Sequence, residues 1–172
     1  MMINQQLTVK LVVFLIITTL FSLSSPARDS DEGGLHQRIE DQVLSDEQLQ
    51  GTQVVLAVKG GDVVLSGTVR LYSQKMRYEQ LVWQTSGVMD VDNEIRVRPH
   101  GLISDRDIKS QILNIKQKYQ RFQGAVIRTV VNNGHVSVNG TFQDASDVLF
   151  FKHRIAEIEG VIRIEIEVKY TV

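Results

Sequence analysis

The chain of 172 residues contains no cysteine, two prolines and few aromatic residues. Without cysteine, the chain can have no disulfide framework, no thiolate metal site and no lipidated cysteine of the bacterial lipoprotein type. The net charge at pH 7 is −1, which gives no overall case for nucleic-acid binding. Hydrophobic residues make up 42% and charged residues 23% of the chain, a balance that predicts a folded protein of one medium or two small domains.

The longest apolar run lies near the N-terminus. Lys10 precedes Leu11 to Leu23, which is short for a membrane span and is typical of a signal-peptide core. Ser25, Pro26 and Ala27 supply the small residues of a cleavage site. We therefore predict that residues 1–27 are a signal peptide, cleaved after Ala27. An uncleaved N-terminal anchor is the alternative.

A shift of 73 residues aligns the two halves of the chain without a gap. The stretch GGDVVLSGTV, which begins at Gly60, then overlies NGHVSVNGTF, which begins at Asn133. The matches fall at turns and apolar positions, and they include Ile39 with Ile112, Val58 with Val131, Val63 with Val136, and Glu94 with Glu167. This pattern predicts an internal repeat, a duplicated domain of about 70 residues.

Each copy divides into the same order of elements. Hydrophobic periodicity predicts a helix, two strands, a second helix and a last strand. The expected ranges in the first copy are Leu35–Gln48, Thr52–Val58, Val63–Ser66, Leu71–Thr85 and Val91–Arg98. In the second copy they are Asp105–Phe122, Ala125–Val131, Val136–Asn139, Asp144–Ile158 and Ile162–Tyr170. The predicted fold class is α+β: two tandem αββαβ units, each a small three-stranded mixed sheet with two helices packed on one face.

Glycines mark the predicted turns at matching positions of the two copies. Hairpin turns are expected at Gly60–Gly61 and at Asn133–Gly134, where positive φ is tolerated. The other structural glycines are expected to mark strand exits or helix C-caps, and they are Gly67, Gly87, Gly140 and Gly160.

These turn and core residues carry a family resemblance. The first copy reads VKGGDVVLSGTV from Val58 to Val69 and GVMDVDN from Gly87 to Asn93, a pattern that resembles the BON family of bacterial proteins. The second copy departs from it, because Phe142 replaces the last valine of the hairpin motif and Ile166 replaces the asparagine. The resemblance covers residues 33–172. It divides the chain into a first domain (33–98), a linker (99–103) and a second domain (104–172).

The resemblance implies a tandem envelope protein of the periplasm or the outer membrane. The family includes the osmotically inducible periplasmic protein and dual-BON outer-membrane lipoproteins, and it is associated with phospholipid binding, envelope integrity and osmotic stress. The lipoprotein relatives carry a lipidated cysteine, which this chain lacks. We therefore expect a soluble periplasmic protein with peripheral membrane contact only.

No catalytic constellation stands out in the sequence. The four histidines, His36, His100, His135 and His153, have no metal-site spacing, and neither a phosphate loop nor a nucleophile elbow is present. We predict that the protein is not an enzyme and has no cofactor, no metal, no small-molecule substrate and no nucleic-acid partner.

The first helix of the second copy is the first candidate binding surface. Asp105 to Phe122 contains five basic and two acidic residues, whereas Asp31 to Leu49 of the first copy contains six acidic residues and one basic residue. Basic helices with an exposed apolar residue dock on anionic phospholipid headgroups. The predicted lipid-binding residues are Arg106, Lys109, Leu113, Lys116, Lys118 and Arg121. An ordinary solvated helix face is the alternative.

The second candidate surface lies on the second helix of the first copy. Tyr72, Met76 and Trp83 fall on one face, and the matching positions of the second copy are Ala145, Leu149 and Ala156. Large residues opposite small ones suit packing of one copy on the other, or the seating of a partner protein. The leading hypothesis is a phospholipid-binding or envelope-binding protein that supports envelope integrity or osmotic-stress tolerance. The alternative is a periplasmic chaperone or adaptor that binds proteins through these apolar residues.

Overall fold

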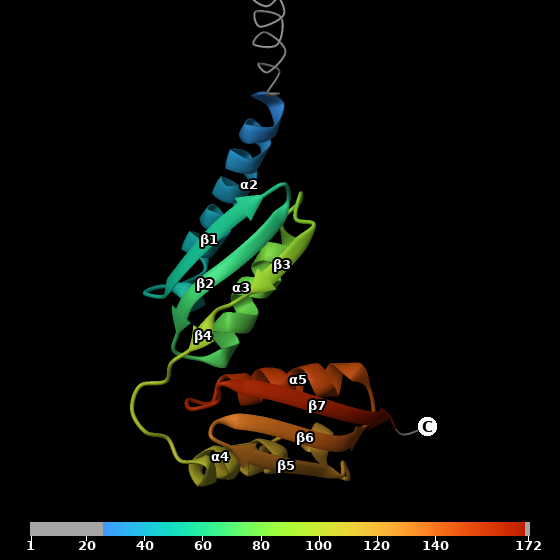
Figure 1. Ribbon diagram of the computed structural model, residues 1–172. Coiled ribbons are helices and arrows are strands. Elements are labelled where there is room, and N and C mark those ends of the chain that lie inside the picture. Colours follow the sequence, from blue (N-terminus) through green and yellow to red (C-terminus); the bar gives the residue numbers. More distant parts are fainter. Residues whose placement is uncertain (1–25, 171–172) are drawn as a thin grey trace, which may run out of the picture.

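A computed structural model shows two small α/β units stacked one above the other (Figure 1). It describes residues 26–170, with side chains from residue 33 onward. Except for its last two residues, the predicted signal peptide lies outside the described residues.

The first unit consists of two helices, a short 3₁₀ helix and four strands. In chain order they are α2 (Pro26–Ser45), η1 (Glu47–Leu49), β1 (Gln53–Lys59), β2 (Asp62–Val69), α3 (Tyr72–Gln84), β3 (Asp90–Asn93) and β4 (Arg96–Val97).

The second unit repeats this order with a single last strand. Its elements are α4 (Asp105–Lys118), η2 (Gln120–Phe122), β5 (Ile127–Asn132), β6 (His135–Phe142), α5 (Ala145–Ala156) and β7 (Arg163–Tyr170).

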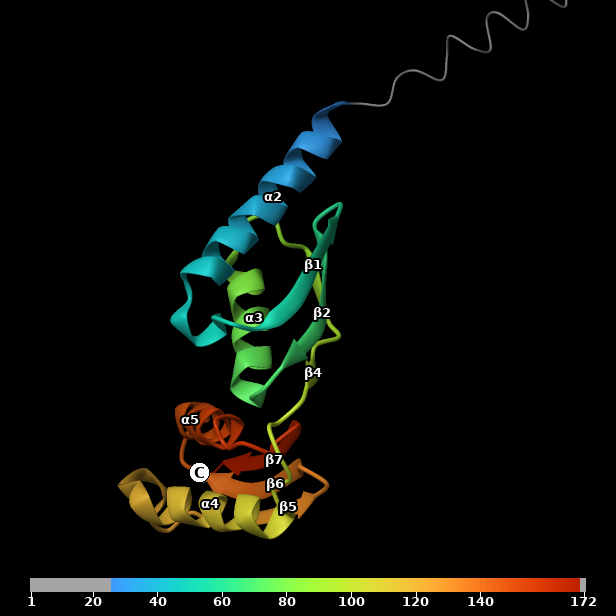
Figure 2. The ribbon, with the colours of Figure 1, turned by 90° about the vertical axis from the view of Figure 1, so that its left-hand side faces the viewer.

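Both sheets are mixed and have the strand that follows the hairpin turn at their centre. β2 pairs antiparallel with β1 and parallel with β3, and β6 pairs in the same way with β5 and β7. The parallel partner is reached through a crossover helix, as parallel pairing requires. In the first unit α2 and α3 lie on one face of the sheet (Figure 2). The predicted fold class, two α+β units with mixed sheets, is confirmed.

Each unit has its own hydrophobic core between its helices and its sheet. The first core is built around Ile39, Val63, Leu65 and Val82, and the second around Ile108, Phe122, Phe151 and Ile155. The burial of these residues follows the spacing of three and four along the helices and of two along the strands.

The first helix of each unit ends earlier than the sequence indicated. α2 begins at Pro26 and ends at Ser45, and the chain then forms η1 after Asp46, whose carboxylate accepts a hydrogen bond from the backbone N–H of Gln48 at 2.9 Å. In the second unit α4 ends at Lys118, before η2. The apolar spacing continues into the 3₁₀ turn because Leu49 and Phe122 are buried there, so periodicity alone does not reveal the change of helix type.

The prediction that Gly67 and Gly140 mark the ends of strands is wrong. Both residues lie within strands, which continue to Val69 and Phe142. Gly67 has a φ of 128°, and a Cβ atom at this position would collide with the carbonyl oxygen of Gln53 on the neighbouring strand. Glycine here permits the close approach of the strand backbones rather than a turn.

The last strand of the first unit is also not the continuous strand that was predicted. It is interrupted between β3 and β4, both of which pair with β2. The ammonium of Lys75 donates hydrogen bonds to the carbonyls of Asn93 and Ile95 at this interruption, at 3.0 and 2.8 Å. Burial at this position lowers the pKa of Lys75 below its usual value.

Candidate functional site

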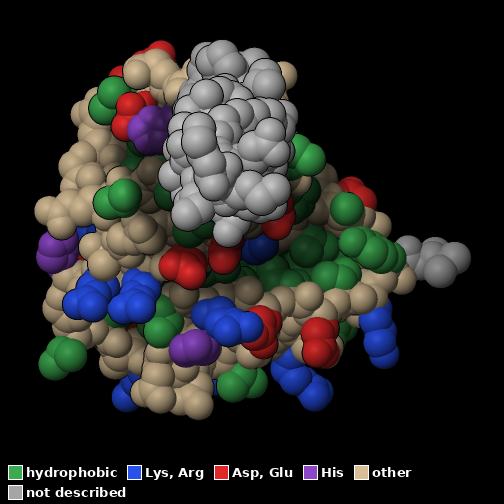
Figure 3. Space-filling model, turned by 45° about the horizontal axis from the view of Figure 1, so that its top comes forward, with side chains coloured by type: hydrophobic (Ala, Val, Ile, Leu, Met, Phe, Trp, Pro, Cys, Tyr) green, Lys and Arg blue, Asp and Glu red, His purple; other side chains and the backbone are tan. Residues whose placement is uncertain are grey.

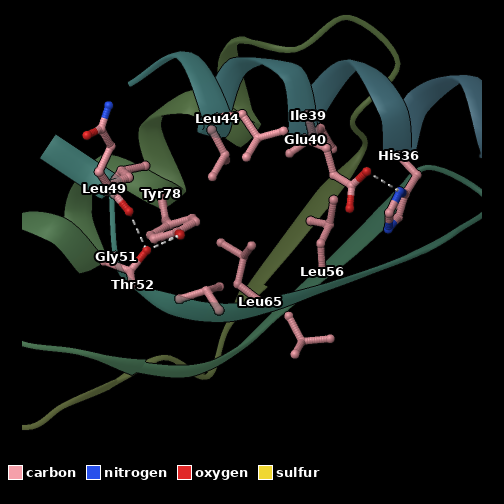
Figure 4. Close-up of a pocket in the computed structure, with 14 residues that line it drawn as sticks. His36, Ile39, Glu40, Leu44, Leu49, Gly51, Thr52, Leu56, Leu65 and Tyr78 are labelled. Atoms are coloured by element: carbon pink, nitrogen blue, oxygen red, sulfur yellow. Dashed lines mark hydrogen bonds and ion pairs between the residues drawn. The ribbon is translucent and has the colours of Figure 1, made fainter. Parts of the chain in front are cut away.

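An open groove separates α2 from β1 in the first unit. Its volume is about 610 Å³, which lies within the range of about 300–1,000 Å³ common for ligand sites. Figure 4 shows Ile39 and Leu44 of α2 on one side of it and Leu56 and Leu65 of the sheet on the other. We call it the α2–β1 groove, and its lining also includes Val43, Leu49, Val54 and Val55.

Polar groups lie at the two ends of the α2–β1 groove. At one end, the hydroxyls of Thr52 and Tyr78 are 2.6 Å apart, and the Thr52 hydroxyl donates to the carbonyl of Leu49 at 2.6 Å. Because the Thr52 hydroxyl has a single proton, the Tyr78 hydroxyl must donate to it. At the other end, His36 Nδ1 and Glu40 Oε2 are 3.6 Å apart (Figure 4). The groove is therefore apolar along its length and polar at its ends.

The corresponding region of the second unit is lined and filled differently. Leu49 is replaced by Phe122, which is buried and makes edge-to-face contacts with the rings of Phe142 and Phe151. Leu44 and Val55 are replaced by Gln117 and Arg128, both exposed. Larger rings in the core and polar residues at the rim thus occupy the positions that form the groove in the first unit.

The predicted lipid-binding residues lie on and just after α4. Arg106, Lys109 and Lys118 are exposed, Leu113 is 54% exposed, and Lys116 is half-buried. Arg121 differs from the others, because it pairs with the buried carboxylate of Asp147 at 3.3 Å and lies over the ring of Phe150. The structure thus places five of these residues on the helix and assigns Arg121 a structural contact as well.

The two acidic residues of α4 are engaged at its first turn. The Asp105 carboxylate accepts hydrogen bonds from the backbone N–H groups of Asn133 and Gly134, at 2.7 and 2.9 Å. Asp107 accepts a hydrogen bond from the hydroxyl of Ser104, the N-cap residue, at 2.6 Å. Both acids are therefore bonded to groups other than the lysines of α4. Within residues 33–170, no ion pair involves Lys109, Lys116 or Lys118.

The N-terminal end of α3 meets the second unit. Tyr72 and Met76 pack against the core of that unit. Burial raises the pKa of Tyr72 above its usual value. Trp83 is 50% exposed. Tyr72 and Met76 are therefore partly covered by the second unit, whereas Trp83 remains accessible.

The remaining predicted glycines bring each hairpin turn against the turn that follows the second helix. A Cβ atom on Gly134 would overlap the carbonyl oxygen of Gly160, and one on Gly61 would lie 2.8 Å from the Cγ of Met89 and 3.1 Å from the carbonyl oxygen of Gly87. The prediction that Gly87 and Gly160 are helix C-caps is wrong, because the C-caps are Thr85 and Glu157. The glycines instead allow the close approach of two backbone segments.

The histidines and the helices give no sign of a metal or membrane-spanning site in the described part of the chain. No group of three or more His, Asp or Glu side chains there could hold a metal ion. Among residues 26–170, no helix has the length and apolar character needed to cross the bilayer.

On the face of the molecule shown in Figure 3, acidic and basic side chains are interspersed around hydrophobic ones.

Comparison with known families identifies the first unit. Residues 31–99 match the BON domain family. The first unit is a BON domain. The match ends at the linker, and the second unit has a similar strand order. BON domains are non-catalytic binding domains associated with phospholipids and the bacterial envelope.

Two solved structures show a distant similarity to about four fifths of the chain. Both are of CdsD, a structural protein of the type III secretion system of Chlamydia trachomatis. One is 15% identical and covers 80% of this chain and 92% of its own, with a TM-score of 0.30. The other, the C-terminal domain, is 13% identical and covers 79% of this chain and 96% of its own, with a TM-score of 0.28. No curated protein matches the chain.

Sequence reasoning missed the α2–β1 groove of the BON domain. A signal was present, because the 73-residue alignment pairs Leu49 with the larger Phe122 and the apolar Val55 with Arg128. The first pair indicates that side chains fill less volume in the core of the first unit than in the second. The second pair indicates that the outer strand of the first unit is more apolar.

Proposed function

We propose that this protein is a non-enzymatic component of the bacterial envelope that binds anionic phospholipid headgroups through α4 of its second unit. The supporting observation is the basic face of α4, defined as Arg106, Lys109, Leu113 and Lys116, with Lys118 at the C-terminal end of the helix. Its lysines have no acidic partner among the described residues, and an exposed leucine lies among them. Each such base contributes about 1 kcal/mol at an anionic membrane surface.

The role of the BON domain in this proposal is mainly architectural. Its first helix is acidic, so anionic headgroups are repelled from α2 and attracted to α4. Binding at one end of the molecule would then leave the BON domain directed away from the membrane, where it can contact other envelope components. Support of envelope integrity or osmotic-stress tolerance would follow from this bridging arrangement.

Vesicle co-sedimentation tests the lipid site. Wild-type protein is expected to sediment with vesicles that contain anionic lipid and to remain in solution with neutral vesicles. The double substitution K109E/K116E should abolish the sedimentation, and added salt should weaken it, because exposed charges are screened beyond about 8 Å at physiological ionic strength.

A matched control distinguishes the loss of the α4 site from the change in the net charge of the protein. The double substitution K59E/K169E makes the same change of net charge on exposed strand residues outside α4. Its binding should stay close to that of the wild type. If K109E/K116E binds as well as the wild type, α4 is not the lipid site.

The proposed location is the periplasm, after export and cleavage following Ala27. The support is the order of Lys10, the apolar run to Leu23 and the small residues before the cut. Cell fractionation combined with mass determination of the mature N-terminus tests this. A mass that retains residues 1–27 would instead indicate the uncleaved anchor.

A further inference from the structure

We propose that the α2–β1 groove and the free edge of β1 form a docking site for an extended polypeptide segment with apolar side chains at alternate positions and basic residues at its flanks. This site is separate from the lipid site on α4 and goes beyond the proposed function. It would add a protein partner to the first unit.

The backbone of β1 offers one unpaired edge. Among the described residues β1 pairs with β2 alone, and its hairpin closes at Lys59 and Asp62 through the two-residue turn Gly60–Gly61. In such a hairpin the closing pair is hydrogen-bonded and the bonded pairs alternate along the strand. The N–H and C=O groups of Val54, Leu56 and Val58 therefore point away from β2, toward the free edge.

The side chains of the same residues face the helix layer. Val54 and Leu56 line the α2–β1 groove together with Leu44, which is 76% exposed, and the groove also reaches Val55 on the other face of β1, which is 66% exposed. The hollow thus extends around the strand edge. A strand added to β1 would direct every second side chain toward α2, into this apolar space.

The edge lacks the protection seen in the second unit. The stretch from Val54 to Val58 is an unbroken apolar run on an edge strand, a feature that native proteins avoid or cover. At matching positions β5 carries Arg128 and Thr129, and α4 carries Gln117. Both outer strands have an unpaired edge, but of the two β1 alone presents an unbroken apolar run there.

The charge of α2 selects among possible occupants. α2 (Pro26–Ser45) carries five acidic residues and two basic residues, and Glu40 lines the groove itself. Pairing of β1 with β1 of a second copy would bring two acidic helices together, whereas a segment with basic flanks is attracted. An acyl chain could fill the apolar space, but it would leave the free backbone groups of β1 unpaired.

Fluorescence anisotropy with a labelled peptide tests the proposal. The probe is a peptide in which valine and serine alternate between flanking lysine pairs, titrated with the purified protein. Binding is expected, and L44Q/V55R, which introduces the residues of the second unit, should weaken it by at least about tenfold. Both positions are exposed, so the fold should persist, and an unchanged circular dichroism spectrum checks this. L149Q, at an exposed leucine of α5, is the matched control and should bind like the wild type.

Changes to the peptide test the mode of binding. N-methylation of alternate peptide bonds should abolish binding because it removes the donors needed to pair with β1, and glutamate flanks should weaken it. If the N-methylated peptide binds as tightly as the parent, or if L44Q/V55R has no effect, the proposal is wrong.

Two other occupants give distinct results that would also overturn the proposal. A dimer that dissociates with V55R in sedimentation velocity would assign the edge to a second copy. A fluorescent fatty acid that binds in a manner sensitive to L44Q/V55R, with no peptide binding, would assign the groove to an acyl chain. K109E/K116E should leave peptide binding unchanged, so failure of the lipid site and failure of the peptide site are distinguishable.

Discussion

The two units share one fold but pack its interior with different chemistry. In the first unit the hydroxyls of Thr52 and Tyr78 form a hydrogen bond, and at the same positions the second unit has Ala125 and Phe151. Both hydroxyls are lost together. Loss of one alone would leave a buried polar group without its partner, which costs more than loss of both.

The same replacement in pairs occurs at a second place. Asp46 and Arg77 form an ion pair at 2.7 Å in the first unit. The second unit has Tyr119 and Phe150 there, with ring centroids 4.9 Å apart in an edge-to-face contact.

A third pair follows this rule at the break in the last strand. Lys75 and Asn93 of the first unit become Val148 and Ile166, and the last strand of the second unit runs without interruption. At these three places the shared fold accepts either two polar residues or two apolar residues, provided that both partners change together.

The largest effect is expected from truncation of the matched residues Phe122 and Leu49. F122A should lower the free energy of unfolding by about 3–5 kcal/mol, because Phe122 is 1% exposed within an aromatic cluster. L49A should cost about 2 kcal/mol, because Leu49 borders a groove that solvent already reaches. Urea denaturation measures both. Equal losses would contradict the difference in packing between the units.

The next effect concerns the contact between the units. Y72A/M76A should remove about 2 kcal/mol of stabilisation, because both side chains pack on the second core. Trp83 is the one tryptophan and reports on the first unit, whereas far-ultraviolet circular dichroism reports on both. The two thermal transitions should separate in the variant. L44A, an exposed control, should leave them unchanged, and coincident transitions in Y72A/M76A would mean that the units are coupled elsewhere.

A smaller effect is expected at the hydroxyl pair. T52A and Y78F should each cost about 1 kcal/mol, and the double variant should cost less than the sum because neither hydroxyl is then left unpaired. A double-mutant cycle from urea denaturation provides the measurement. Strict additivity would mean that the two hydroxyls do not stabilise each other.

The smallest effect is expected at the ion pair between Arg163 and Glu165 on the exposed face of β7. The two side chains are 2.9 Å apart and largely solvent-exposed, and the first unit has Asp90 and Asp92 at these positions. R163A should change the free energy of unfolding by less than about 0.5 kcal/mol. A larger loss in urea denaturation would show that β7 depends on this pair.

The order of elements and the central strands could be predicted from the sequence because apolar spacing and turn glycines are local signals. Val136 and Val138 of β6 alternate with the polar residues Ser137 and Asn139, and the turn at Asn133–Gly134 fixes the hairpin register. The basic character of α4 could likewise be counted from residue types.

Features that depend on the fit of side chains could not be predicted. The alignment of Leu49 with the larger Phe122 indicates less side-chain volume in the first core, but the opening of that space as a groove depends on the path of α2, for which the sequence carries no local signal. The role of Gly67 within a strand follows from the approach of the Gln53 carbonyl. The engagement of Arg121 with Asp147 joins residues from different elements, for which the sequence carries no local signal.

The mixed sheet has a consequence for the order in which each unit folds. Hairpins such as β1–β2 join neighbouring segments and close in about 1–10 μs. The parallel pairing of β3 with β2 requires the chain to close a much longer loop, which includes α3. Closing this loop costs more conformational entropy than closing the hairpin. Addition of the last strand should therefore limit the folding rate of both units. In this step the unbroken β7 forms more residue pairs with the central strand than the two short segments β3 and β4 do.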